Sequence, residues 1–136
     1  MGKKEAMVSA LCRELELRKN EFTNVVVETI YFGGGTPSVL ETSEIEQLIA
    51  AVREHYDVVD NLEITLEANP DDLSEEKILQ LADSPINRLS IGIQSFFEED
   101  LKLMNRAHNA LEAEKCLQLA SEHFDNISID LIYGMP

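Results

Sequence analysis

The hydrophobic positions of this chain follow two alternating periods, one of about 3.6 residues and one of 2. Residues 4–20 have the helical period and predict an amphipathic helix. The residues near its apolar face are Met7, Leu11, Leu15, Arg18 and Phe22. The run VVVETIYF at residues 25–32 is β-branched and aromatic, and it predicts a buried strand. Three further strands are predicted at residues 62–68, 88–95 and 127–134.

The segments between these strands carry helix signals. A capping box of Ser43 and Glu46 is expected to open the helix after the first strand. Its apolar stripe is Ile45, Leu48, Ile49, Val52 and Tyr56. Ser74 begins the next helix, which Pro85 ends. A short helix at 98–104 follows, and Asn109 with Glu112 begins a longer one. The residues that face inward from this last helix are Ala113, Leu117, Ala120 and Phe124.

Strands that alternate with helices predict right-handed crossovers and a parallel sheet. The fold class is therefore α/β, with about four parallel strands, and either an open doubly wound sheet or part of a (β/α) barrel satisfies the pattern. Residues 1–136 contain no repeat and no internal linker, so they form one domain or part of one.

Polar residues and glycines gather where the predicted strands end. The first strand runs into Gly33, Gly34, Gly35 and Thr36, the second ends at Glu67, the third at Gln94, and the fourth carries Asp130. The carboxyl ends of parallel strands form one edge of the sheet, where ligands bind in α/β folds. The opposite strand ends carry nothing comparable. This asymmetry predicts a ligand site at the carboxyl edge.

Each of these residues also has a structural interpretation. The glycine run can be a turn without a ligand, although bare backbone also lets a ligand approach closely. It lacks the lysine and spacing of a phosphate-binding loop. Glu67 and Asp130 can pair with an internal arginine or cap a helix, and Gln94 can be a sheet-edge amide. Arg106 lies between two predicted helices and can hold a carboxylate. His108 beside it is predicted to be solvated.

Composition narrows the function classes. The chain has 26 acidic and 11 basic residues and a formal net charge of -15, which disfavours nucleic acids and anionic membranes as partners. No apolar run reaches the roughly 20 residues of a membrane span, and the N-terminus resembles neither a signal nor a transit peptide. The two cysteines, Cys12 and Cys116, are far apart in helical patterns. They predict buried free thiols in a reducing cytoplasm rather than a metal site.

Five motifs in order resemble the radical SAM family of oxygen-independent coproporphyrinogen III oxidase: YFGGGTPS, LEANPDDL, RLSIGIQSF, LMNRAHNA and ISIDLIYGMP. The resemblance covers roughly residues 5 to 136. The motif EANPDDL is most similar to the oxidase-like branch, which includes the heme chaperone HemW. A partial (β/α) barrel with its site at the carboxyl ends of the strands is the fold that the resemblance implies.

The resemblance also implies roles for individual residues. Gly34, Gly35 and Thr36 would contact S-adenosylmethionine, Glu67 would contribute a carboxylate, and Gln94, Arg106 and Asp130 would add polar contacts. The family holds a [4Fe–4S] cluster on a C-x-x-x-C-x-x-C loop, and this sequence has no such motif. The chain is thus expected to be the central part of a longer barrel, to bind no cluster by itself and to be inactive alone.

In the intact family, the reduced cluster splits S-adenosylmethionine into a carbon radical. In the oxidase that radical leads to decarboxylation of a porphyrinogen, whereas the chaperone branch binds and transfers heme. The resemblance therefore implies a radical SAM protein of porphyrin metabolism in the cytoplasm, either an oxidoreductase or a heme carrier. A generic α/β nucleotide-binding domain is the alternative of another class. Four strands alone would leave open edges, so self-association is expected, with Ile91 and Ile129 lacking neighbours.

Overall fold

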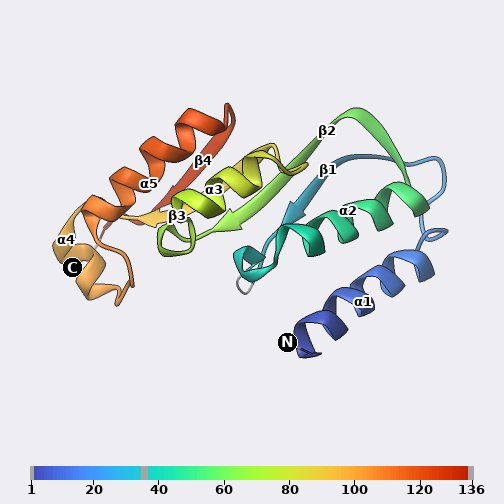
Figure 1. Ribbon diagram of the computed structural model, residues 1–136, viewed down its shortest axis with the longest axis horizontal. Helices are drawn as coiled ribbons and strands as arrows, with labels where there is room; N and C mark the ends of the chain where they lie inside the picture. The colour runs from blue at the N-terminus through green and yellow to red at the C-terminus, as the bar shows by residue number, and fades with distance from the viewer. Residues whose placement is uncertain (1, 35–36, 135–136) are drawn as a thin grey trace. The chain divides into compact units, whose positions relative to one another are not determined.

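The structure is a computed structural model that describes residues 2–34 and 37–134. Four strands alternate with five α-helices and two short 3-10 helices in the described part of the chain (Figure 1). In chain order the elements are α1 (Gly2–Leu17), β1 (Val26–Phe32), η1 (Pro37–Val39), α2 (Thr42–His55), β2 (Asp57–Ala68), η2 (Pro70–Asp72), α3 (Glu75–Ala82), β3 (Arg88–Gln94), α4 (Glu98–Leu103), α5 (Ala110–His123) and β4 (Ile127–Leu131).

The strands form one sheet in the order β1-β2-β3-β4, so strands that are neighbours in the sequence are neighbours in the sheet. The pairs β2–β3 and β3–β4 are parallel. The predicted α/β class, with four parallel strands alternating with helices, is therefore confirmed. The chain divides into two compact units, residues 1–30 with 40–63, and residues 31–39 with 64–136.

The first unit contains α1 and α2, which pack together through an ion pair from Lys4 to Glu44 (3.2 Å). The apolar stripe predicted for α2 is confirmed at its centre, where Ile45, Leu48 and Ile49 are at most 5% exposed. The helix begins earlier than predicted, because the Glu41 backbone N–H donates to the Glu44 side chain (2.8 Å). The capping box predicted at Ser43 and Glu46 is thus wrong by two residues.

The buried face of α1 also differs from the apolar face predicted for it. Val8 is its one buried residue among those described, whereas Met7 and Leu11 are exposed. The helical period is confirmed, but the buried position is Val8, one residue after Met7, while Leu15 of the predicted stripe is half-buried. Phe22 lies beyond the end of α1 and is exposed as well.

The first strand forms where VVVETIYF predicted it, but none of its seven residues is buried. It is the end strand of the described sheet and has a hydrogen-bonded neighbour on one side only. β-branched composition indicates a strand but does not say which position the strand takes in the sheet. The prediction of a buried first strand is therefore wrong.

The second unit has its core on one face of the sheet. Side chains alternate between the two faces of a strand, and Leu66, Leu89, Ile91 and Ile93 are all fully buried. The helices α3 and α5 pack against each other over these strands (Figure 1). They contribute the buried residues Ile78, Leu81, Ala113, Cys116 and Ala120. Ile91 is completely buried on this face, so the expectation that it would lack packing neighbours is wrong.

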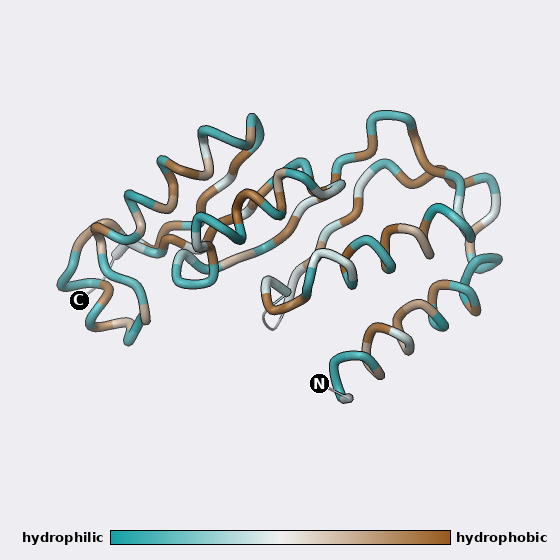
Figure 2. The backbone as a smooth tube through the Cα atoms, viewed as in Figure 1, coloured by the Kyte–Doolittle hydropathy of each residue, from teal (hydrophilic) through white to brown (hydrophobic). Residues whose placement is uncertain are grey.

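The helix starts predicted at Ser74 and Asn109 in this unit are confirmed. The Ser74 hydroxyl accepts the Lys77 backbone N–H (3.1 Å) and begins α3. Asn109 accepts the Glu112 backbone N–H (2.8 Å) and begins α5. Figure 2 shows apolar and polar residues interleaved along these helices, as one packed and one solvated face require. Among the described residues, no helix has the length and apolar character needed to cross a membrane.

The two cysteines differ in their environment. Cys116 is buried on α5, and burial raises the pKa of its thiol to about 11, whereas Cys12 on α1 is half-buried. Because the thiolate is the reactive form, we expect a disulfide reagent at pH 8 to modify Cys12 quickly and Cys116 only on unfolding. The variant Cys12→Ser should leave one slow thiol. A Cys116 that reacts as fast as Cys12 would contradict this assignment.

The raised pKa of Cys116 also gives stability a pH dependence. The neutral thiol is favoured in the folded state, so its contribution to stability is complete below the ordinary thiol pKa of 9.0 and is lost as the pH rises toward 11.

Candidate functional site

The carboxyl edge of the sheet in the second unit carries a polar hollow of about 100 Å³. Its wall consists of Gly34, Pro37, Ser38, Glu67, Ala68, Asn69, Gly92, Gln94 and Asp130. Four predicted site residues, Gly34, Glu67, Gln94 and Asp130, therefore lie around one space. They come from the ends of all four strands, as the parallel topology predicted.

Pleating explains why these residues share a face. The register aligns Glu67 with Ser90, and Ser90 with Ser128, across β2, β3 and β4. The residues on either side of them in each strand are apolar, and Leu66, Leu89 and Ile91 among them are fully buried. The same two-residue alternation that buries Leu66 and Ile91 therefore turns Glu67 and Gly92 to the opposite face.

Gly33 and Gly34, in the loop after β1, are each required for a different physical reason. A Cβ on Gly33 would lie 2.7 Å from Cε1 of Tyr31 and 3.0 Å from a Glu67 carboxylate oxygen, so bare backbone is needed to fit these side chains. Gly34 has a φ of +86° and open space around it. Its backbone conformation, not crowding, requires glycine. Gly35 and Thr36 lie outside the described residues, and their roles stay predictions.

Glu67 is half-buried and is held by Tyr31, which the sequence did not single out. The Tyr31 hydroxyl donates to a Glu67 carboxylate oxygen at 2.7 Å. This hydrogen bond raises the pKa of Tyr31 above its ordinary value of 10.0, partly opposed by a bond with Ser90. The one indication of this contact in the sequence is that side chains alternate between the two faces of β1, which places Tyr31 on the same face of the sheet as Glu67.

We expect the variant Glu67→Gln to lower the pKa of Tyr31 toward 10.0, because the charged acceptor is lost. Absorbance titration of the phenol, with Tyr31→Phe as the reference spectrum, measures it. The stabilising effect of the bond should be complete below pH 10 and lost as the pH rises through the raised pKa. An unchanged tyrosine titration in Glu67→Gln would show that the hydrogen bond does not persist in solution.

Gln94 adopts a strained backbone at the end of β3. Its φ is +69°, and the Ser95 N–H donates across it to the Ile93 carbonyl (2.8 Å), which is the hydrogen-bond pattern of a γ-turn with positive φ. Such a conformation costs on the order of 1–3 kcal/mol in a residue other than glycine. The turn coincides with a shift in the β3–β4 register between Ile91 and Gln94.

Gly92 makes room for the Gln94 side chain. A Cβ on Gly92 would lie 3.0 Å from the Gln94 amide nitrogen and 3.3 Å from the Asn69 side-chain oxygen. The two amide side chains therefore occupy the space above a bare backbone. Asn69 is a second residue that sequence reasoning missed, although it follows Glu67 closely in the motif EANP.

Arg106 and His108 lie in the segment between α4 and α5. Arg106 is exposed and is not part of the wall of the hollow. His108 is 4% exposed, and its Nε2 donates to the Ile93 carbonyl (2.8 Å). The prediction of a solvated His108 is therefore wrong, because a histidine with a carbonyl partner can be buried without an unsatisfied polar group.

The charge of the hollow restricts what it can hold. Its wall contains two carboxylates, Glu67 and Asp130, and no basic side chain among the described residues. Such a site favours a cation or hydroxyl groups and disfavours phosphate. The described residues contain no group of three or more metal-ligating side chains.

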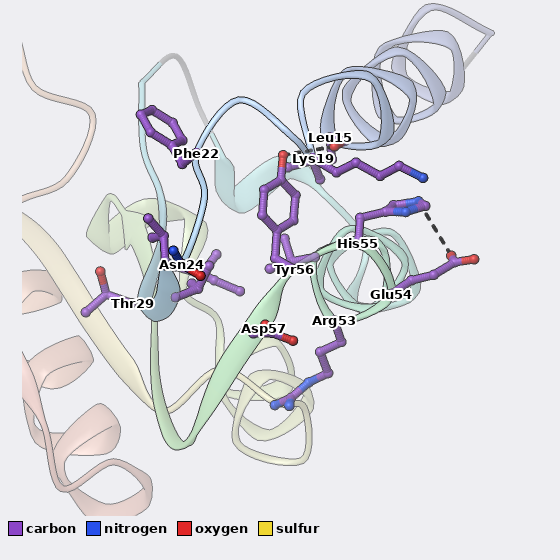
Figure 3. Close-up of a pocket in the computed structure, with 14 residues that line it drawn as sticks. Leu15, Lys19, Phe22, Asn24, Thr29, Arg53, Glu54, His55, Tyr56 and Asp57 are labelled. Atoms are coloured by element: carbon purple, nitrogen blue, oxygen red, sulfur yellow. Dashed lines mark hydrogen bonds and ion pairs between the residues drawn. The ribbon is translucent and has the colours of Figure 1, made fainter.

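A larger hollow of about 580 Å³ lies in the first unit, and none of the predicted site residues lines it (Figure 3). The Tyr56 hydroxyl donates there to the Leu15 carbonyl at 2.9 Å. Lys19 and Arg53 point in different directions (Figure 3), and the acidic residues Glu54 and Asp57 also line the hollow. Because the charges are mixed and diverge, this hollow does not select a ligand of one charge.

Comparison with known proteins places this geometry in a family. Residues 11–136 match the Radical SAM superfamily. The heme chaperone HemW of Lactococcus lactis is 41% identical over 97% of this chain and 34% of its own length. HemW of Escherichia coli K12 is 39% identical over 81% of this chain and 29% of its own length.

Solved structures agree with this assignment. The coproporphyrinogen III oxidase HemN of Escherichia coli, described as a radical SAM enzyme, is 32% identical, with a TM-score of 0.83 over 98% of this chain and 31% of that chain. The Elp3 protein of Methanocaldococcus infernus is 24% identical with a TM-score of 0.69 and shares the fold, over 93% of this chain and 33% of its own. The chain spans about a third of the length of the curated relatives it matches. Because the family match covers residues 11–136 and relatives of up to 41% identity align with nearly all of it, the chain belongs to the radical SAM superfamily.

Proposed function

We propose that the hollow at the carboxyl edge binds one end of S-adenosylmethionine. The observation that supports this most is the charge of the wall, which has two carboxylates and no basic side chain. S-adenosylmethionine carries an ammonium and a sulfonium cation, whereas a nucleotide brings phosphates that this wall would repel. The hollow of about 100 Å³ is smaller than the roughly 300–1,000 Å³ of whole-ligand pockets, so it would take a single polar end.

The residues present fit this ligand by their chemistry. The Glu67 carboxylate, fixed by Tyr31 at 2.7 Å, can accept hydrogen bonds from an ammonium group. Asp130 and the Gln94 amide can bond hydroxyl groups. Gly34 exposes its backbone at a φ of +86°. Arg106, outside the hollow, would hold the carboxylate of the ligand, and Gly35 and Thr36 would add contacts.

The protein contributes binding and orientation, and the bound cofactor supplies the radical chemistry. Cys12 and Cys116 do not fit a [4Fe–4S] cluster, because they lie on helices of different units and a cluster needs three neighbouring thiolates. We derive no step through a cluster from these residues. A longer gene product would have to supply its ligands.

The experiment is calorimetric titration of the full-length gene product with S-adenosylmethionine and, separately, with ATP. We expect binding of the first only. Glu67→Gln and Arg106→Lys should each weaken it by about 1–3 kcal/mol, since each removes part of a charge-assisted hydrogen bond. Glu122→Gln, an exposed change on α5, is the matched control and should bind as wild type. Tighter binding of ATP would contradict the proposal and favour a generic nucleotide-binding domain.

For the whole protein we propose a role in heme metabolism in the cytoplasm, as a heme chaperone. The basis is that the similar curated proteins are named HemW heme chaperones at up to 41% identity, against 32% for the oxidase. A coproporphyrinogen III oxidase is the second candidate, supported by the TM-score of 0.83. Heme titration beside an assay of coproporphyrinogen decarboxylation separates them, because a chaperone binds heme and yields no decarboxylated product.

A further inference from the structure

Buried His108 has a partner that connects it to the candidate site. Its Nε2 lies 2.8 Å from the carbonyl oxygen of Ile93, the residue before Gln94. A carbonyl oxygen can only accept, so Nε2 carries the proton and donates. The same carbonyl accepts the Ser95 N–H at 2.8 Å. His108 is therefore hydrogen-bonded to one of the two peptide groups that flank Gln94.

The other peptide group is bonded by the residue that follows β4, the parallel neighbour of β3. The Ile132 N–H donates to the Gln94 carbonyl at 2.7 Å. Beyond the turn, the buried Ser95 hydroxyl accepts the Phe97 N–H at 2.9 Å. A residue with positive φ keeps that conformation only when its surroundings fix it. Two other parts of the fold provide this restraint, His108 between α4 and α5 and Ile132 after β4, and the Ser95–Phe97 bond adds to it within the loop itself.

His108 also anchors the segment that carries Arg106, two residues before it. Two backbone hydrogen bonds tie the start of this segment to α4, from the Asn105 N–H to the Lys102 carbonyl and from the Arg106 N–H to the Leu101 carbonyl, both at 3.1 Å. We propose that His108 is a positioning residue of the site, which fixes the Gln94 turn through the Ile93 carbonyl and holds the Arg106 segment beside it. The ligand affected is S-adenosylmethionine, so this inference rests on the proposed function.

The first test needs no ligand. In full-length protein labelled with nitrogen-15 at histidine, the His108 ring should show a proton on Nε2 that exchanges slowly with water. Loss of this signal in His108→Leu identifies it. A ring protonated on Nδ1 alone, or a fast-exchanging signal, would overturn the proposal, because the hydrogen bond to Ile93 would then be absent.

The second test compares three variants of the full-length gene product by titration with S-adenosylmethionine. His108→Leu keeps an apolar side chain and removes the donor, and it should weaken binding about tenfold. His108→Gln keeps an N–H donor and should restore most of the affinity. Phe124→Ala is the control, since it loses buried area at the far end of α5, whose 14 residues span about 21 Å, and it should bind as wild type.

The outcomes separate this inference from the proposed function. If Gln94→Ala weakens binding and His108→Leu does not, His108 is not a positioning residue although the site stands. Equal losses in His108→Leu and Phe124→Ala would show a general loss of stability and overturn the positioning role. Failure of His108→Gln to restore binding would also overturn it. If the unmodified protein binds no S-adenosylmethionine, both proposals fail.

Discussion

Replacing Gly34 by valine should weaken S-adenosylmethionine binding by the full-length gene product at least about tenfold, and should lower the free energy of unfolding by about 1–2 kcal/mol. Gly34 has a φ of +86°, and a Cβ there would meet no atom within 4 Å. The expected cost is therefore one of backbone conformation, which a β-branched residue adopts least readily. To avoid it, the loop must change its backbone conformation, and with it the wall of the hollow that Gly34 lines.

The matched variant is Gly34→Asn, which adds a larger side chain but tolerates positive φ. It should retain most of the affinity, because the space around Gly34 is open. Calorimetric titration and urea unfolding measure the two quantities. If Gly34→Val binds as the wild type does, the glycine is a turn residue without a role in the site. Equal losses in both variants would point to steric exclusion rather than conformation.

Replacing Leu66 by alanine should destabilise the chain by about 2–5 kcal/mol, the usual cost of a cavity in a packed core. Leu66 is fully buried in β2, next to Glu67 on the opposite face. This is a large fraction of the roughly 5–15 kcal/mol that stabilises a typical domain. Loss of the core face should also disorder the polar face, because both belong to the same strand.

Urea unfolding of Leu66→Ala beside Leu111→Ala tests this. Leu111 is 60% exposed on α5, so the same chemical change there should cost no more than about 0.5 kcal/mol. A cost below about 1 kcal/mol for Leu66→Ala would mean that the core relaxes around the cavity or that Leu66 is not packed as described.

Several features of this protein could be predicted from the sequence, because they depend on interactions within a few residues. Ser74 and Asn109 cap helices through N–H groups three residues away. The periods of 2 and 3.6 gave the strands and most helices. Parallel topology then predicted that Glu67, Gln94 and Asp130 share one edge, since all parallel strands end there.

Other features were decided by contacts between distant residues, which no local period encodes. The exposure of β1 follows from its place at the end of the described sheet. Tyr31 and Glu67 are 36 residues apart in sequence, and His108 meets Ile93 across 15. The two peptide groups that flank Gln94, a residue with positive φ, are bonded by His108 and by Ile132, which lie far from it in the sequence. The local pattern thus predicted the edge at which the candidate site lies, while tertiary packing decided which side chains surround it.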